Sequence, residues 1–366
     1  MRKIRVKIEG GRGYDILVGF GILPQIGRQI RRVGVRGSVF LITSPAIGRH
    51  YLNPLLKGLK AGGCKDVCVA HVPDGEKHKN VAWAEKLLRK LGQFAGSDKD
   101  VFVVNLGGGV IGDMGGFVAA TYRRGIAYIQ VPTTLLAFVD CGIGGKVGVN
   151  LDGAKNLVGS FHQPKLVCAD LALLDTLAKR ELRSALAEVV KYGVIQDHRF
   201  FEYVEGNIDK VFSLDRSVIE YIAVKCYTMK ADIVRQDEFD RKGIRMRLNF
   251  GHTIGHAIES ASNYAYRHGE AVSIGMVCAN DISVKLGLMG KSVAARIENV
   301  LIKIGLPVKA KNHNLDRIMQ FLRLDKKSIN GKNRFVLATG IGKTRIKENI
   351  PERVIRDVIK NRFSFS

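Results

Sequence analysis

Histidines gather at one point of the sequence. The segment LNFGHTIGHAIES places His252 and His256 four residues apart, on one face of a predicted helix, and His268 follows at the start of another segment. Three of the nine histidines therefore fall within 17 residues, a density that packing alone does not explain. Catalytic zinc sites use three protein ligands and an open position, so the pattern predicts a metal centre. Thr253 stands where the zinc-protease motif HExxH has its glutamate, which excludes that class.

A glutamate in the segment ALAEVVKYG is a candidate for a further ligand. Glu188 and Lys191 stand three residues apart, so a helix carries both side chains on one face. A surface ion pair is one interpretation, but a glutamate buried on so apolar a helix needs a strong partner, and a metal ion is one. Glu188 with two of the three histidines would complete a zinc site. Spacing favours His252 with His256 but does not decide between the pairs.

A second group of residues follows the predicted strand DVFVVNL. The sequence GGGVIGD at 107–113 matches GxGxxG between that strand and a predicted helix. Glycines let the backbone approach a pyrophosphate, and the helix N-terminus supplies amide donors. A tight turn with close packing is the alternative, and no acidic residue ends the next strand to hold a ribose. We predict a nucleotide or phosphate site at this turn.

A longer glycine-laced segment, residues 139–159, contains Asp140, Lys146, Lys155 and Asn156. Its pattern predicts neither a regular helix nor a core strand, and loops on a rigid scaffold often carry function. Two lysines beside glycines suit an anionic ligand such as phosphate, with an ordinary polar loop as the alternative. We therefore predict a functional loop that binds an anion.

Two shorter polar segments lie next to predicted strands. Glu76 and Lys79, in DGEKHK, would indicate only a solvated helix start if they stood alone. Thr133 and Thr134, in VPTTLLA, can contact a phosphate or a ribose, or can equally cap the helix that follows. Neither segment identifies a ligand by itself.

The elements that must position these residues change in kind along the chain. The first half alternates β-branched runs with helical patterns, which predicts βα units around a mainly parallel sheet, with strands at 39–43, 66–72, 100–106 and 127–132. The start, MRKIRVK, alternates basic and apolar residues as an edge strand does. From about Asp175 the apolar spacing is helical. We predict an α/β domain, residues 1–172, then a mainly helical domain, residues 173–366, with ligands between them.

Composition and charge exclude several classes of protein. The 366 residues contain no run of twenty apolar residues, and the start lacks the features of a secretory signal, so we predict a cytoplasmic protein without a membrane span. Six scattered cysteines fit free thiols in a reducing compartment. The net charge is +24, yet the basic residues are dispersed and the aromatic content is only 7%. We predict a solvated basic surface that attracts an anionic substrate, and no nucleic-acid partner.

Several segments, in their order and spacing, together resemble the 3-dehydroquinate synthase family over nearly the whole chain. They are GGGVIGDMGGFVAATYRRGI, VPTTLLA, GGKVGVN, KNLVGSFHQP, AEVVKYG, LNFGHTIGHAIE, HGEAVSIGM and DKKSINGKNRFVL. The resemblance implies a homodimer with an N-terminal Rossmann-like, NAD-binding α/β domain and a C-terminal, mainly helical metal-binding domain. It also implies NAD and one divalent metal, Zn²⁺ or Co²⁺, as cofactors.

Position by position, the resemblance implies Glu188, His252 and His268 as metal ligands, which leaves His256 to contact the substrate or relay a proton. Arg124 is implied to reach the substrate phosphate across the dimer interface. The other implied substrate contacts are Asp140, Lys146, Lys191, Lys230, Arg245, Asn249, and Lys326 or Lys327. The implied NAD contacts are Glu76, Lys79, Gly108, Gly109, Asp113, Thr133, Thr134, Lys146, Lys155, Asn156, Thr176 and Leu177.

The substrate that the resemblance implies is 3-deoxy-D-arabino-heptulosonate 7-phosphate. NAD oxidises its C5 hydroxyl with the metal as Lewis acid, phosphate leaves by elimination, the hydride returns, and an aldol step closes the carbocycle. A metal-dependent polyol dehydrogenase is one competing interpretation, and a basic nucleic-acid-binding protein, supported only by charge, is another. Phe138, Cys141 with Gly142, and Ser44 with Ala46 depart from the family's pattern, and the last pair removes an acidic ribose contact.

Overall fold

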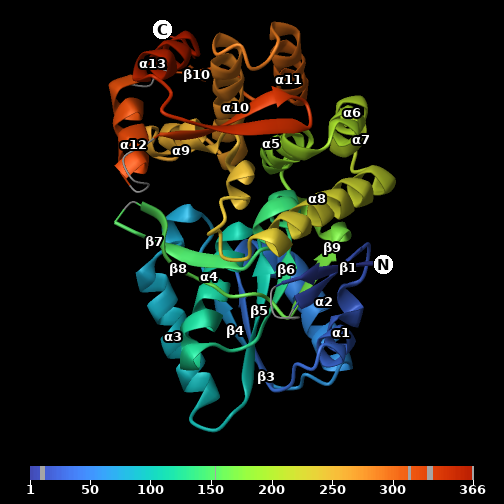
Figure 1. Cartoon of the computed structure of the whole chain (residues 1–366). Coiled ribbons are helices and arrows are strands. Elements are labelled where there is room, and N and C mark those ends of the chain that lie inside the picture. Colours follow the sequence, from blue (N-terminus) through green and yellow to red (C-terminus); the bar gives the residue numbers. More distant parts are fainter. Residues whose placement is uncertain (9–12, 153, 312–314, 328–332, 365–366) are drawn as a thin grey trace. The chain divides into compact units, whose positions relative to one another are not determined.

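The computed structural model describes residues 1–8, 13–152, 154–311, 315–327 and 333–364, with all side chains in these ranges except those of 324–327 and 364. The chain divides into two compact units (Figure 1). The first unit comprises Met1–Leu177 and Ile219–Phe239, and the second comprises Ala178–Val218 and Asp240–Ser366. All but the first three residues of helix α8 (Arg216–Gln236) therefore belong to the first unit.

A seven-stranded sheet forms the centre of the first unit, in the order β1-β2-β9-β6-β5-β3-β4. Six strands are parallel, and β1 pairs antiparallel with β2 at the edge. The predicted α/β class, the four predicted strands and the edge strand are confirmed. The strands are β1 (Arg2–Lys7), β2 (Gly13–Gly19), β3 (Ser38–Thr43), β4 (Val67–His71), β5 (Val101–Gly107), β6 (Tyr128–Pro132) and β9 (Leu166–Asp170).

Helices cover both faces of this sheet, because successive residues of each strand point to opposite sides. Val39 and Leu41 of β3 pack in one core with α1 (Ile26–Arg32) and α2 (Pro45–Ala61). Phe40 and Ile42 pack in the opposite core with α3 (Val81–Ala95) and α4 (Gly109–Thr121) (Figure 1). Helix α4 begins directly after β5, so the glycine turn lies at the carboxyl end of a central strand.

The glycine-laced segment 139–159 is not a loop, so that part of the prediction is wrong. A π-helical turn, η5 (Ala137–Cys141), leads to an antiparallel hairpin of β7 (Lys146–Leu151) and β8 (Ala154–Phe161). Val147 and Val149 of β7 are buried in the core of α3 and α4, whereas most of β8 is exposed. Val147, Val149 and Leu151 alternate with Gly148 and Asn150, which is the pattern of a strand, whereas β8 (AKNLVGSF) shows no such alternation.

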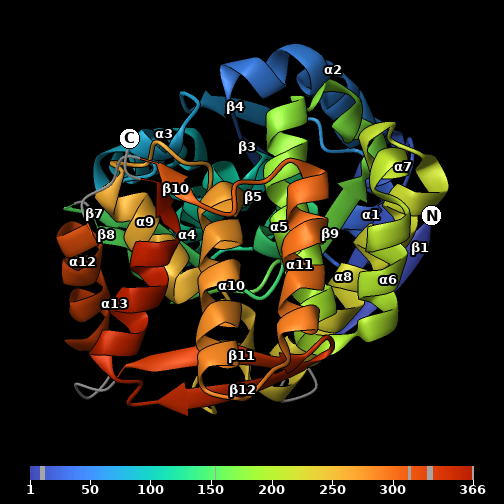
Figure 2. The same cartoon turned by 90° about the horizontal axis from the view of Figure 1, so that it is seen from above.

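The second unit is mainly helical, as predicted, and α10 (His268–Lys285) is buried along most of its length. It packs against α5 (Lys179–Gln196), α9 (His252–Ala261), α11 (Lys291–Ile304), α13 (Glu352–Asn361) and strand β11 (Arg334–Gly340) (Figure 2). Two of the helices that contact α10, namely α5 and α9, carry predicted metal ligands, and α10 itself begins with a third.

Smaller elements complete the second unit. Strand β12 (Lys343–Glu348) pairs antiparallel with β11, and β10 (Ala310–Lys311) pairs parallel with β13 (Phe363–Ser364). The remaining helices are α6 (His198–Gly206), α7 (Ile208–Phe212), η7 (Arg245–Asn249) and α12 (Leu315–Lys327). In the described ranges, every helix is too short or too polar to span a lipid bilayer.

Candidate active site

Three predicted metal ligands, from three helices of the second unit, meet at one point. Nε2 of His252 lies 3.4 Å from Oε1 of Glu188, and Nε2 of His268 lies 3.6 Å from the same oxygen. One ligand atom from each residue falls within 4.8 Å of the other two, and Glu188 is fully buried. His256, which spacing favoured, is exposed and lies outside this group. A carboxylate with two imidazoles is a donor combination of catalytic zinc sites.

A glycine lets α10 approach α5 closely enough for His268 to reach Glu188. A Cβ at Gly269 would overlap the backbone carbonyl of Ser184, which precedes Glu188 by one helical turn. The Gly269 amide donates to Oγ of Ser184 at 3.0 Å. Because Gly269 follows His268 directly, this contact fixes the position of the His268 backbone, and with it the point from which the imidazole side chain extends toward Glu188.

Helices α9 and α10 also pack closely where Gly275 faces Gly251, and a substitution at Gly275 tests how much this close packing stabilises the fold. A Cβ at Gly275 would overlap the carbonyl oxygen of Gly251, which directly precedes His252 and has a left-handed φ of 79°. We expect Gly275→Ala to lower the free energy of unfolding by about 1–3 kcal/mol, the usual cost of overpacking. Urea unfolding measures this. Gly206→Ala, at a helix end with open space around it in the described structure, is the control, and equal midpoints for both variants would contradict the expectation.

Electrostatic interactions within the metal group are strong. Burial raises the pKa of Glu188, yet Lys191 and the two histidines lower that pKa well below its ordinary value, and the Lys191 ammonium pairs with Oε2. Burial and the charge of Lys191 lower the pKa of His252 to about 3, so this imidazole is neutral. Burial also opposes a charge on His268, but Glu188 and Glu259 raise its pKa to about 9. Without metal, His268 is therefore an imidazolium at pH 7.

The other ring nitrogen of each ligand histidine has its own partner. Nδ1 of His252 lies 3.1 Å from the backbone oxygen of Phe250. Nδ1 of His268 lies 3.4 Å from Oε1 of Glu259, a buried residue of α9 that the sequence analysis did not single out. Its spacing from His252 was an available signal, since residues seven apart share a helix face. These contacts turn both Nε2 atoms toward Glu188, as outer partners of metal-binding histidines do.

In the first unit, the glycine turn after β5 has the predicted strand–turn–helix setting. Gly108 directly precedes α4 and Gly109 begins it. A Cβ at Gly108 would lie 3.1 Å from Thr134, and a Cβ at Gly109 would lie 3.1 Å from the sulfur of Cys141. Side chains at these positions would therefore fill the turn. Helix α4 starts without a side-chain cap, which leaves first-turn amides available to an anion.

Lys79 is the centre of a buried polar network beside this turn. Its ammonium donates to Oδ2 of Asp113 and to Oδ1 of Asn156, both at 2.5 Å. Asn150, a residue that the sequence analysis missed, donates to Oε1 of Glu76 at 2.9 Å and accepts from the backbone amide of Asn156. Burial disfavours the ammonium, but Asp113 and Glu76 raise the pKa of Lys79. Four of the predicted NAD contacts, from segments far apart in sequence, thus lie together.

The two threonines after β6 differ in their contacts. Thr134 Oγ1 accepts from the backbone amide of Ala137 at 3.1 Å, which is the helix-capping interaction that the sequence left open. The hydroxyl of Thr133 is buried and has no hydrogen-bond partner among the described residues. A buried hydroxyl without a partner is costly, so a bound polar ligand is a fitting partner for it.

Further predicted residues of the first unit lie as follows. The ammonium of Lys230, on α8, donates to both the backbone oxygen and Oδ1 of Asp140, at 2.6 and 2.5 Å. Lys146 begins β7 and is exposed, and Lys155 is half-buried on β8. At the end of the 3-10 helix η6 (Leu171–Thr176), the hydroxyl of Thr176 shares a 2.7 Å hydrogen bond with Tyr51, and Leu177 follows it.

Arg124 has an unusual backbone. It ends the 3-10 turn η4 (Tyr122–Arg124) with a φ of 64°, directly after Arg123 at 47°, and its side chain is exposed. In the described part of the chain Arg124 has no side-chain partner. The guanidinium of Arg123 instead donates to the backbone oxygens of Gly96, Ser97 and Lys99, which anchors the turn.

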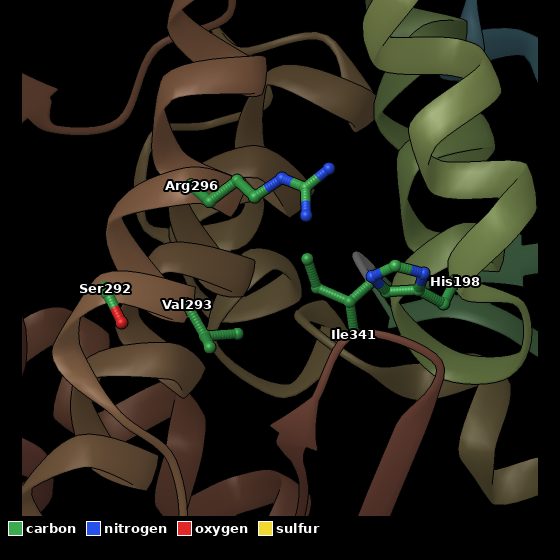
Figure 3. A pocket seen from close by; sticks show the side chains of 5 residues that line it. All are labelled: His198, Ser292, Val293, Arg296 and Ile341. Carbon is green, nitrogen blue, oxygen red and sulfur yellow. The ribbon is translucent and has the colours of Figure 1, made fainter.

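The remaining predicted residues belong to the second unit. Arg245 is buried and Asn249 exposed, at the two ends of η7, which leads into α9. Lys326 and Lys327 end α12, and their side chains lie outside the described part of the structure. A separate pocket of about 250 Å³ holds none of the predicted site residues (Figure 3). It is lined by His198, Ser292, Val293, Arg296 and Ile341.

Comparison with families of known proteins gives two adjoining matches. Residues 69–184 match the 3-dehydroquinate synthase N-terminal model, and residues 185–328 match the 3-dehydroquinate synthase C-terminal model. The chain is 42% identical to the 3-dehydroquinate synthase of Thermodesulfovibrio yellowstonii, over 98% of this chain and 99% of that one. It is also 42% identical to the 3-dehydroquinate synthase of Nostoc punctiforme, over 95% of this chain and 96% of that one.

Solved structures with the same fold bind two kinds of cofactor. A 2-deoxy-scyllo-inosose synthase, complexed with carbaglucose-6-phosphate, NAD⁺ and Co²⁺, matches with a TM-score of 0.88 at 25% identity, over 98% of this chain and 99% of that one. A 2-epi-5-epi-valiolone synthase from Streptomyces hygroscopicus, with NAD⁺ and Zn²⁺ bound, matches over the same shares with a TM-score of 0.87 at 24% identity. With both family models and relatives above 40% identity in agreement, the chain belongs to the 3-dehydroquinate synthase family.

Proposed function

We propose that this chain converts 3-deoxy-D-arabino-heptulosonate 7-phosphate to 3-dehydroquinate and phosphate, the reaction of a 3-dehydroquinate synthase. The observation that carries the proposal is the convergence of Glu188, His252 and His268 from three helices. It occurs in a chain that is 42% identical to a 3-dehydroquinate synthase over nearly its full length. A shared fold alone would not support a particular activity, because one fold hosts many chemistries.

Glu188, His252 and His268 would hold one divalent metal, Zn²⁺ or Co²⁺. The buried carboxylate and the two Nε2 atoms fit the three-ligand pattern that leaves a coordination position open for substrate. The structural relatives with Zn²⁺ and Co²⁺ support the choice of metal. When bound, the metal would act as a Lewis acid on a substrate hydroxyl.

NAD would bind in the first unit at the glycine turn. The N-terminus of α4, which has no side-chain cap among the described residues, suits its pyrophosphate, and the buried hydroxyl of Thr133 suits a polar group of the cofactor. Bound NAD would supply a reversible hydride acceptor. The residues that we propose to hold it are Glu76, Lys79, Gly108, Gly109, Asp113, Thr133, Thr134, Lys146, Lys155, Asn156, Thr176 and Leu177.

The chain's cationic side chains would bind and orient the anionic substrate. Lys191 lies beside Glu188, where its ammonium can hold a substrate oxygen next to the metal. Lys230 is fixed by two hydrogen bonds to Asp140, so its charge is already oriented before substrate arrives. His256, exposed next to the ligand histidines, would contact substrate or relay a proton through its imidazole. The other proposed contacts are Lys146, Arg245, Asn249, and Lys326 or Lys327.

We propose that the active form is a cytoplasmic homodimer. Arg124 has a left-handed backbone conformation, is exposed and has no partner among the described residues. Such a conformation costs about 1–2 kcal/mol in an L-residue, and backbone strain of this kind clusters at functional sites. These features support a role for Arg124 at the substrate phosphate of the partner subunit.

Incubation of the purified chain with the heptulosonate phosphate, NAD and Zn²⁺ or Co²⁺ tests the proposed reaction. We expect one phosphate released for each substrate consumed, together with a carbocyclic product, and no reaction when either cofactor is omitted. A metal-loaded chain that binds NAD but releases no phosphate would contradict the proposal.

Metal affinity is expected to rise with pH. A metal ion binds the neutral imidazole of His268, whose pKa Glu188 and Glu259 raise to about 9 against the effect of burial, whereas His252, with a pKa of about 3, is already neutral. Below the pKa of His268 each metal ion must displace one proton, so affinity should rise about tenfold per pH unit between about pH 7 and pH 9. Chelator competition measures this, and a flat profile would contradict it.

A further inference from the structure

Glu259 is a buried carboxylate next to the metal group. It lies on α9, only 2% exposed, and its Oε1 is 3.4 Å from Nδ1 of His268. His268 thus stands between two carboxylates, because its Nε2 faces Glu188 while its Nδ1 faces Glu259. Burying a carboxylate costs free energy unless the carboxylate is paired or hydrogen-bonded, and the imidazole of His268 supplies such a partner.

Two arrangements fit this contact. In the first, Glu259 accepts the Nδ1 proton of His268 and leaves Nε2 free to bind the metal. In the second, Glu259 joins His256 and His268 as ligands of another cation, since these three residues also have ligand atoms within 4.8 Å of one another. The second arrangement would make His268 a deprotonated bridge between two cations, with the exposed His256 as one ligand. The first needs only a neutral imidazole, which is the form that metal ions bind.

We propose that Glu259 is a positioning residue for the metal centre: it fixes the ring orientation and the proton location of His268, and its negative charge strengthens metal binding. The inference rests on the proposed metal site. It follows from general chemistry, because a carboxylate on the far nitrogen makes an imidazole a better electron donor to the metal. A Glu259 that served packing alone would affect stability but not the affinity or the spectrum of the bound metal.

Co²⁺ binding to full-length variants separates these roles. Glu259→Gln keeps an oxygen acceptor and nearly the same shape but removes the charge, whereas Glu259→Leu removes both. We expect the dissociation constant for Co²⁺, measured by chelator competition above pH 9, where protons no longer compete with the metal for His268, to rise about tenfold in Glu259→Gln and about a hundredfold in Glu259→Leu. The visible absorption of bound Co²⁺ should shift in both variants, because the orientation of one ligand changes.

The matched control is Glu298→Gln. Glu298 lies on α11 of the same unit, its carboxylate accepts two hydrogen bonds from Arg362, at 2.5 and 2.9 Å, and it belongs to neither group of possible metal ligands. This variant removes one carboxylate charge from a helix just as Glu259→Gln does. We expect it to bind Co²⁺ with the affinity and spectrum of the unmodified chain, whatever its effect on stability.

The outcomes are distinct. Unchanged Co²⁺ affinity and an unchanged spectrum in Glu259→Gln would overturn the proposal. Binding of two Co²⁺ ions per unmodified chain, with only one in Glu259→Gln, would also overturn it, because Glu259 would then be a ligand of a second cation. If Glu259→Leu does not fold, Glu259→Gln decides alone. The proposed function can fail separately: a chain that binds one Co²⁺ through His268 but releases no phosphate would leave the role of Glu259 intact.

Discussion

Alanine at Glu188, at His252 or at His268 is expected to remove the bound metal and to lower turnover by about a thousandfold or more. The loss of one of three protein ligands leaves two, fewer than a catalytic zinc site retains. A metal that polarises a substrate oxygen is worth several kcal/mol of barrier, and about 4 kcal/mol corresponds to a thousandfold in rate. Metal analysis of the purified variants, together with phosphate release, measures both effects.

His256→Ala is the informative comparison for this experiment. Its ring centroid lies 5.2 Å from that of His252, yet the geometry does not group it with Glu188. We expect this variant to keep its metal and to lose activity, because His256 is proposed to act on substrate. An empty His256→Ala with a loaded His268→Ala would show that the ligands are wrongly assigned.

The second large effect is expected at Lys79. Replacement by methionine removes the ammonium that pairs with Asp113 and leaves that carboxylate in a buried site, where burial already raises its pKa. Breaking a buried pair in this way typically costs about 3–5 kcal/mol, because one charge is left without compensation. We expect a loss of this size in the free energy of unfolding of Lys79→Met, measured in urea, together with loss of NAD binding, measured by calorimetry.

Two further variants interpret the effect of Lys79→Met. The double variant Lys79→Met with Asp113→Asn should recover part of the lost stability, because it removes the unpaired charge. Lys99→Met breaks a surface pair with Asp66 and should leave unfolding unchanged, since exposed ion pairs contribute little. If Lys79→Met unfolds at the same urea concentration as the unmodified chain, the buried pair does not stabilise the fold.

Local sequence patterns predicted many of the strands and helices. Runs of apolar, mainly β-branched residues predicted β3, β4, β5 and β6; the inner strands β3, β5 and β6 are buried on both faces and must therefore be apolar along their whole length. Helical spacing of the apolar residues from about Asp175 predicted the helices of the second half, because a helix that packs on one face is apolar at every third or fourth position. The hairpin of β7 and β8 was missed, because the alternation of β7 spans only a few residues of a glycine-rich segment and β8 shows no alternation of its own. The place of residues 219–239 in the first unit is likewise a matter of long-range packing, which no local pattern records.

The sequence predicted which residues belong to the candidate site better than it predicted which of them contact one another. His252 and His268 were predicted as candidate ligands because histidines so close in sequence are rare. Glu188 was predicted because a carboxylate on an apolar helix needs a partner. Glu259 was not singled out, because a glutamate on an amphipathic helix is ordinarily solvated, and its burial follows from tertiary packing around α9, which contacts α10 and α12. Lys79 and Asp113 are 34 residues apart, and tertiary packing brings them together: Lys79 lies just before α3, Asp113 lies on α4, and α3 packs against α4.

The redox balance of turnover distinguishes a cyclase from a dehydrogenase most directly. A dehydrogenase releases reduced cofactor with every product molecule, whereas a 3-dehydroquinate synthase returns the hydride to the carbon from which it came. The measurement follows NADH absorbance and free phosphate together, with NAD far below the substrate concentration. We predict phosphate equal to the substrate consumed, over many turnovers per NAD, and no net NADH at steady state. NADH in step with substrate consumption, without phosphate release, would contradict the assignment and favour a polyol dehydrogenase.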